Sequence, residues 1–472
     1  MSLGLFQALT ISARAMDTQQ AGIAVTGNNL ANVNNPNYSR QVLDISTSIS
    51  VPTDIGMEGT GVQATGVQQI VSQALNSQIQ SENSTASYWQ TQQQALEFAQ
   101  SDLGQQITSA SSSSSDSSQG IASSLSDFFN ELQNFSADPS SLSERQVLIG
   151  KASTLASQFN QVSQQLGALT SQLNDQLQTD VTNANQLLSD IAGLNQQIST
   201  EQIDTNSAPN DLMDMREQKL EDLANLVNFS VSSEANGSLD ISIGGVQMVS
   251  GFNVTNTLST YDAGGGQMLV EAGNGQTVTP LTLTGGSMAG EIDARDGSVA
   301  TLNNNLNTLA SQLITAVNTV HETGYGLNGT SKALFFTGSD ASDIAVNTAL
   351  VNDPSLIQAS GTKGVTGDNT VALEMAQLAN QLNPNLDNQT FGQSYDNTVA
   401  TLGQSLSSAS NEVSDQDTVQ QMLSQQRSSI SGVSLVEEMG NLSAYQTAYE
   451  ASAHFMNAID QMLQILVSLQ SS

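Results

Sequence analysis

Apolar residues recur at every seventh position near both ends of this 472-residue chain. A seven-residue repeat places apolar side chains along one seam of a helix, as in coiled coils. The first repeat predicts a helix over about residues 4–33, which ends before Pro36 because proline disfavours helical geometry in the preceding residue. The last repeat predicts a second such helix after residue 431. The seam residues are Leu9, Met16, Ile23 and Leu30 in the first helix, and Leu435, Leu442, Tyr449, Met456 and Leu463 in the second.

The strongest helical pattern of the interior lies between Pro139 and Pro209. Its apolar residues follow a 4-3-4-3-4 spacing from Leu155 to Leu173, which predicts one very long helix or two joined helices. A serine-rich run at 109–115 is low in complexity and predicts a turn or loop. Asp211 is expected to cap the next helix. Further helical patterns cover 67–107, 299–317, 371–382 and 395–430.

The period of the apolar pattern changes to two at about Phe229, which indicates β-strands. The pairs Asn236-Gly237 and Asn274-Gly275 predict two hairpin turns, because asparagine and glycine tolerate positive φ angles. Glycine and threonine dominate as far as Gly290. Glycine-rich sequence at 55–66 also indicates extended or hairpin structure.

These patterns predict an α+β chain that is predominantly α, with three parts. Residues 1–66 and 431–472 form a terminal domain in which the two end helices pair as an antiparallel coiled coil. Residues 67–228 and 293–430 form an elongated helical bundle. Residues 229–292 form a small inserted β domain that faces outward.

Composition excludes several classes of function. The chain has 44 acidic and 10 basic residues, and its formal net charge is −34. This charge disfavours nucleic acid and anionic membranes as partners, because both bind to a positive protein surface. There is no cysteine, and two histidines leave little room for a metal site. No run approaches the length of a membrane span, and the N-terminus lacks the pattern of a cleaved secretory signal.

The remaining chemical groups do not assemble an active site. His321 is expected near a helix end, without a second histidine at zinc-site spacing. His454 and Trp89 are expected to pack between helices. The adjacent acids Glu437 and Glu438 point about 100° apart on a helix, which favours a solvated face or a contact between subunits. We therefore predict no catalytic residue, no metal and no cofactor.

Both ends carry recognisable motifs. The run from Asn28 to Gln41, with Asn34-Asn35-Pro36 and Tyr38-Ser39-Arg40-Gln41, resembles the N-terminal signature of flagellar rod, hook and hook-associated proteins. Asn37 stands where that group usually has glycine, and we expect it to adopt a left-handed conformation. The run from Ser431 to Ala453 resembles the C-terminal signature of the same group.

About 160 mainly helical residues follow from Val67 to Val227, and this arrangement resembles the hook-associated protein 1 family. The resemblance implies a non-enzymatic structural subunit at the junction of hook and filament, outside the cell. It implies export without a cleaved signal through the flagellar type III channel, with a cytoplasmic export chaperone. Other implied partners are copies of the chain, the hook protein and the next hook-associated protein. Besides the seam residues, the expected assembly interface contains Asn32, Tyr38, Arg40 and Glu438.

Two alternatives stay open from the sequence. A hook or distal-rod subunit shares both terminal motifs, and a large β domain directly after residue 70 would favour it. A secreted coiled-coil adhesin or effector would instead place its function in the central β domain. An enzyme is the weakest reading, because no acid pair in a cleft is visible.

Overall fold

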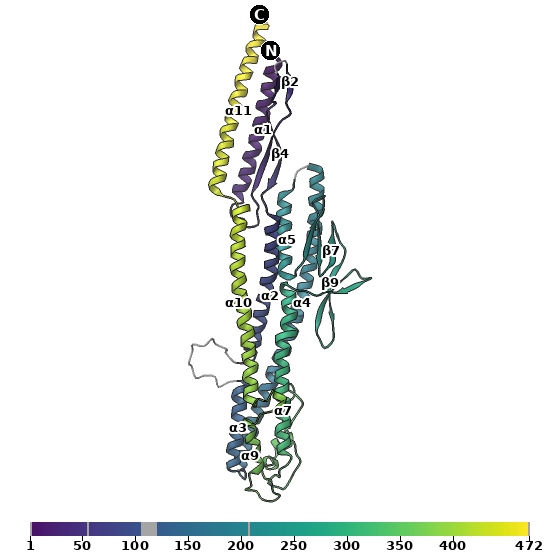
Figure 1. Cartoon of the computed structure of the whole chain (residues 1–472), viewed down its shortest axis with the longest axis vertical. Coiled ribbons are helices and arrows are strands. Elements are labelled where there is room, and N and C mark those ends of the chain that lie inside the picture. The colour runs from purple at the N-terminus through teal and green to yellow at the C-terminus, as the bar shows by residue number, and fades with distance from the viewer. Residues whose placement is uncertain (1, 54–55, 105–119, 206–207, 471–472) are drawn as a thin grey trace.

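The computed structural model describes residues 2–53, 56–104, 120–205 and 208–470. These residues form a long, narrow molecule with both chain ends at the same end (Figure 1). The serine-rich run at 109–115, expected as a turn or loop, lies outside the described residues.

The terminal helices α1 (Ser2–Ala31) and α11 (Leu435–Gln470) lie side by side and run antiparallel, as the heptads predicted (Figure 1). They approach closely where Gly22 faces Tyr445, because a Cβ atom on Gly22 would lie 2.7 Å from the tyrosine ring. Strands also contact α1: β1 (Gln41–Thr47) pairs antiparallel with β4 (Val62–Gln69). Between them lies a short hairpin, β2 (Val51–Thr53) and β3 (Gly56–Glu58). The pattern analysis indicated extended structure only from residue 55, so it missed β1.

The segment between Pro139 and Pro209 forms a single helix, α4, of 64 residues. At 1.5 Å per residue it spans about 96 Å. Asp211 does not cap the next helix: Pro209 occupies the cap position, and Asp211 lies in the first turn. The helix expected from residue 67 starts only at Gln73, because β4 occupies 62–69. The long helices are α2 (Gln73–Asp102), α3 (Ile121–Ala137), α4 (Leu142–Thr205), α5 (Asn210–Leu226), α7 (Ala300–His321) and α10 (Phe391–Ser431).

Two antiparallel sheets project from the side of α4 (Figure 1). Both predicted hairpin turns are present, with φ of 80° at Gly237 and 81° at Gly275. The first sheet has the order β5-β6-β7-β8, and the second has the order β11-β10-β9. Their strands are β5 (Ser230–Ser233), β6 (Leu239–Ile243), β7 (Val246–Ser250), β8 (Asn253–Val254), β9 (Thr257–Asp262), β10 (Met268–Gly273) and β11 (Val278–Pro280).

The range expected as a β domain ends in a helix instead, α6 (Gly286–Asp293). Met288 and Ala289 of α6 are buried, and the helix packs on α2 and α4. This tertiary packing outweighs the low helix propensity of its glycines. A π-helical segment, Ala294–Val299, links α6 directly to α7.

The interior contains two large apolar cores. The first core lies around α3, the first part of α4, α7 and α10, and it includes the tilted rings of Phe128, Phe335 and Phe336. Trp89 packs against this core, as expected. The second core joins the later part of α4 and α5 to the two sheets. Four short elements contribute residues to the first core. They are β12 (Phe336–Thr337), β13 (Ala345–Val346), α8 (Thr348–Asn352) and α9 (Thr370–Gln377).

Candidate functional site

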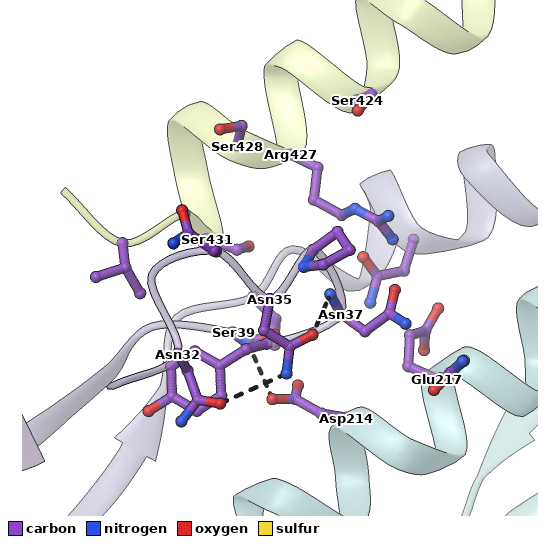
Figure 2. Close-up of a pocket in the computed structure, with 18 of the residues that line it drawn as sticks. Asn32, Asn35, Asn37, Ser39, Asp214, Glu217, Ser424, Arg427, Ser428 and Ser431 are labelled. Carbon is purple, nitrogen blue, oxygen red and sulfur yellow. Dashed lines mark hydrogen bonds between the residues drawn. The ribbon is translucent and has the colours of Figure 1, made fainter. Parts of the chain in front are cut away.

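Four segments meet where the terminal helices join the bundle: the end of α1, the loop before β1, the start of α5 and the turn between α10 and α11 (Figure 2). Backbone hydrogen bonds fix the meeting point. The amide of Arg40 donates to the carbonyl of Ser431 over 2.8 Å, and the amide of Ile70 donates to the carbonyl of Arg40 over 2.8 Å. We call this region the terminal joint, which comprises Asn29, Tyr38, Arg40, Gln41, Glu437 and Glu438.

Arg40 binds both neighbouring acids of α11. Its Nη1 and Nη2 donate to the two carboxylate oxygens of Glu437 at 3.0 and 2.7 Å, which is the bidentate geometry that guanidinium favours. Its Nε lies 3.2 Å from Oε1 of Glu438, an ion-pair contact without hydrogen-bond alignment. Glu438 is only 2% exposed. The expectation of a solvated face is therefore wrong for Glu438, which contacts Arg40 and Asn29 within the chain.

The buried side chain of Asn29 uses all of its hydrogen-bonding capacity. Its Nδ2 donates to the carbonyl of Gln41 at 2.8 Å and to Oε2 of Glu438 at 3.1 Å. Its Oδ1 accepts from the hydroxyl of Tyr38 at 2.8 Å and from the amide of Gln41 at 2.9 Å. One amide thus links α1, the loop, β1 and α11. A side chain that makes all four bonds has no close substitute among the other residue types.

Two aspartates of α5 complete the joint. Oδ1 of Asp211 accepts from Nε2 of Gln41 at 2.9 Å, and Oδ2 of Asp214 accepts from the amide of Ser39 at 2.9 Å. Burial raises the pKa of Asp214 above that of an ordinary carboxyl. Burial, followed by the nearby charges of Asp211 and Asp214, raises the pKa of the Tyr38 hydroxyl. Tyr38 therefore stays a neutral hydrogen-bond donor, and the joint is anchored on the bundle.

A polar cavity of about 280 Å³ lies beside the joint, under the asparagine-rich loop (Figure 2). Asn37 was expected in a left-handed conformation, and this is wrong: among described residues other than glycine, positive φ occurs only at Lys332, Asp387 and Asn388. Instead, the amide of Asn37 donates to Oδ1 of Asn35 at 3.2 Å. Such a side-chain turn redirects the chain without a left-handed residue.

The expected seam residues lie in different environments. On α1, Leu9, Met16, Ile23 and Leu30 are all half-buried, and Asn32 is half-buried in the loop. The fully buried positions of α1 are instead small or polar, and they are Ser12, Thr18, Gly22, Thr26 and Asn29. On α11, Leu435 is exposed, whereas the other four expected seam residues, Leu442, Tyr449, Met456 and Leu463, are half-buried.

A second apolar face of α11 was missed. Its side chains stay exposed, with exposed fractions of 51% for Phe455 and 59% for Ile465. The repeated i, i+3, i+4, i+7 spacing of Met462, Ile465, Leu466 and Leu469 was visible in the sequence, beside the heptad positions. We call this the outer face of α11; its residues are Phe455, Met462, Ile465, Leu466 and Leu469.

The two histidines differ. His321 is the last residue of α7 and is buried, and its Nδ1 lies 2.7 Å from the carbonyl oxygen of Ala333. Its Nε2 accepts from the amide of Gln358 at 2.9 Å, so one neutral tautomer satisfies both partners. Burial lowers its pKa to about 4. His321 is a structural residue near a helix end, as expected, whereas His454 is exposed and the expectation of packing is wrong.

Among the described residues, no three side chains of histidine, aspartate or glutamate gather closely enough to bind a metal ion. No helix within the described ranges is sufficiently long and apolar to span a membrane.

Comparisons with protein families match two parts of the chain. Residues 107–336 match the family "Flagellar hook-associated protein FlgK helical domain". Residues 424–469, which include the turn of the terminal joint and most of α11, match the family "Flagellar basal body rod FlgEFG protein C-terminal".

Curated relatives match the chain over nearly its whole length. Flagellar hook-associated protein 1 of Bacillus subtilis is 27% identical and covers 98% of both chains. The proteins of the same name from Salmonella typhimurium and Escherichia coli are 25% and 24% identical, over 96% of this chain and 98% of theirs. The solved structure of the flagellar hook junction protein FlgK from Burkholderia pseudomallei shares the fold, with a TM-score of 0.63 and 17% identity. It matches 75% of this chain and all of that one.

Proposed function

We propose, because the chain belongs to the flagellar hook-associated protein family, that it forms the junction zone between the hook and the filament. Its relatives are structural proteins of the flagellum, and the chain has that structural role. We further propose that it performs no catalysis and binds no cofactor. The bond between neighbouring parts of the flagellum is then its only task.

The outer face of α11 carries this proposal. Large apolar side chains follow this helix, and no described residue of the chain covers them. Each such side chain contributes about 1.5–3 kcal/mol when it is fully buried. Several of them together can offset the entropy lost when subunits associate. The proposed occupant of this face is a second copy of the chain in the junction.

We propose that assembly also completes the burial of the half-exposed seam residues of α1 and α11. In this account Asn32 and three residues of the terminal joint, Tyr38, Arg40 and Glu438, support the assembly interface. They do so by fixing the angle between the paired terminal helices and the bundle. The three-part division into 1–66 with 431–472, 67–228 with 293–430, and 229–292 is retained as part of the proposal. The terminal part would line the axis, and the β domain would face outward.

The proposed partners are copies of the chain, the hook protein, the next hook-associated protein and a cytoplasmic export chaperone. Assembly with flagellar components follows from the family, and the particular partners are our proposal. We place the mature protein outside the cell, exported without a cleaved signal. A curved hook and a stiffer filament require a subunit that bonds to both, and a rigid joint with an apolar face on each copy supplies this.

The hook or distal-rod alternative is not favoured. It called for a large β domain directly after residue 70, whereas the helix α2 occupies residues 73–102.

A deletion of the gene in its native host tests the proposal. Electron microscopy of the cell surface should show hooks without filaments, with flagellin released as monomer into the medium. The full-length gene should restore filaments, and a gene that lacks residues 431–472 should not. Loss of the hooks would move the protein to the rod or hook, and normal motile filaments would contradict a flagellar role.

A further inference from the structure

A buried polar cluster lies where the two apolar cores meet. Along α4, the first core ends at Leu173 and the second begins at Leu177. Along the α6 region, Met288 belongs to the second core and Ala294 to the first. Around these limits, polar side chains of the two segments contact each other, Asp180 with Ser287 and Asn174 with Arg295, and Glu291 lies between Met288 and Ala294. We call them the polar seam, which comprises Asn174, Asp180, Ser287, Glu291 and Arg295.

Two carboxyl groups of the seam are almost inaccessible to water. Asp180 is 4% exposed; its Oδ1 accepts from Nε2 of Gln176 at 2.9 Å, and its Oδ2 accepts from the hydroxyl of Ser287. Glu291 is 2% exposed, and its Oε2 has no hydrogen-bond partner. A buried carboxylate without donors is unfavourable, so the structure indicates a neutral Glu291.

The one cation of the seam does not compensate Glu291. Nε and Nη2 of Arg295 form an ion pair with Asp296, with both distances at 2.7 Å. Its Nη1 donates to Oδ1 of Asn174 and to the carbonyl of Met268, with both distances at 2.6 Å. Arg295 therefore joins α4 to strand β10, and its charge is matched by Asp296.

The other helices that pack on α6 bring no compensating charge. From α2, the hydroxyl of Tyr88 donates to Asp293 at 2.8 Å. Charged side chains of α5 are either engaged elsewhere or exposed, and they are Asp211, Asp214, Arg216, Glu217, Lys219, Glu221 and Asp222. Burial first, and the charge of Asp180 second, raise the pKa of Glu291 to about 9, and Arg295 opposes them. Glu291 thus carries a proton at neutral pH.

The backbone around Glu291 is also unusual. The π-helical segment 294–299 starts three residues after it, and π-turns inside helices are rare and often mark functional positions. On the other side, α6 lies tightly against α2: a Cβ atom on Gly290 would lie 2.7 Å from the carbonyl oxygen of Tyr88. Gly290 therefore allows the close approach of α6 to α2, whereas Asp180 of α4 lies near enough to Glu291 to disfavour a second charge there.

We propose that the polar seam is a proton-dependent link between the two cores, closed while Glu291 is protonated and weakened when Glu291 ionises. Ionisation loosens the contact of α6 with α4 and so frees the second core, with its sheets, from the first. This inference does not depend on where the chain sits in the flagellum.

The test compares the wild type with Glu291→Gln, which imitates the protonated acid, in thermal unfolding between pH 5 and pH 9. A carboxyl whose pKa is raised by folding stabilises the fold below its ordinary pKa, and this contribution is lost as pH rises toward the folded pKa. The wild-type unfolding constant should therefore rise with pH at least about tenfold more than that of Glu291→Gln. Glu374→Gln is the control, because Glu374 is exposed and the substitution removes the same charge. Its unfolding constant should depend on pH as strongly as that of the wild type.

The fluorescence of Trp89, the only tryptophan, reports on the surroundings of α2 near α6, because its ring lies 5.0 Å from that of Tyr88. Below the melting temperature, its emission should change between pH 5 and pH 9 in the wild type and stay constant in Glu291→Gln. If Glu291→Gln does not fold, Asp180→Asn replaces it in the test, because it removes the second acid of the polar seam. The unfolding constant of Asp180→Asn should depend less on pH than that of the wild type. The proposal would be overturned if the unfolding constants of the wild type and of the seam variants that fold had the same pH dependence. It would also be overturned if Glu374→Gln reduced this pH dependence as much as the seam variants do.

Discussion

Arg40→Ala is expected to accelerate amide exchange at the terminal joint about 5- to 150-fold in the isolated protein. The substitution leaves Glu438, 2% exposed, as a buried carboxylate whose remaining side-chain donor is Asn29. The loss of a partner by a buried polar group destabilises the closed joint by about 1–3 kcal/mol. The open form of the joint is then more populated by the stated factor, and amide exchange accelerates by the same factor. Exchange mass spectrometry of peptides covering 36–44 and 431–445 measures the effect.

Arg14→Ala is the matched control for this experiment. Arg14 lies exposed on α1, and its Nη1 donates to the hydroxyl of Ser48 at 2.7 Å. Removal of Arg14 leaves no buried charge without a partner, so the change in stability should stay within about 0.5 kcal/mol. If Arg40→Ala exchanges no faster than Arg14→Ala at the joint, the ion pair with Glu437 and Glu438 does not hold the joint together.

Phe455→Glu is expected to abolish filament formation in complemented deletion cells. Phe455 lies on the outer face of α11, and the proposed junction buries this face between copies. Burial of an ionised carboxylate without a partner costs several kcal/mol. A loss of only about 1.4 kcal/mol in the binding free energy between two subunits already lowers their affinity tenfold. The fraction of cells with filaments, counted by electron microscopy, should fall at least about tenfold.

Asn457→Glu adds the same charge to the same helix and serves as the control. Two residues correspond to about 200° around the helix, so Asn457 lies away from the outer face. Asn457 is exposed, and a charge there should leave filaments intact. Normal filaments with Phe455→Glu, or equal loss with both variants, would show that the outer face is not the assembly surface.

The predictable parts of the fold depend on short-range patterns. The seven-residue repeats predicted the pairing of α1 with α11, and the pairs Asn236-Gly237 and Asn274-Gly275 predicted their turns. Each of these signals lies within one element and is decided by neighbouring residues. The α6 helix was missed because packing against α2 and α4, which are distant in sequence, stabilises it against the propensity of its glycines.

The terminal joint could be predicted only in part, because its partners are far apart in the chain. Arg40 and Glu437 are separated by 397 positions, and no local pattern pairs them. The adjacent acids on α11 were not expected to share a site, but both contact Arg40, and the environment of Glu438 also depends on Asn29. The outer face of α11 was overlooked for a different reason: a helix with two apolar stripes was interpreted through its heptad alone.

Immunogold electron microscopy of intact flagella tests the central claim most directly. Antibodies against this protein, applied to wild-type cells with the deletion strain as control, should label one narrow zone at the distal end of the hook. The account predicts that the label is absent from the length of the hook and from the filament. Label along the hook, along the filament or over the cell body would contradict the junction role.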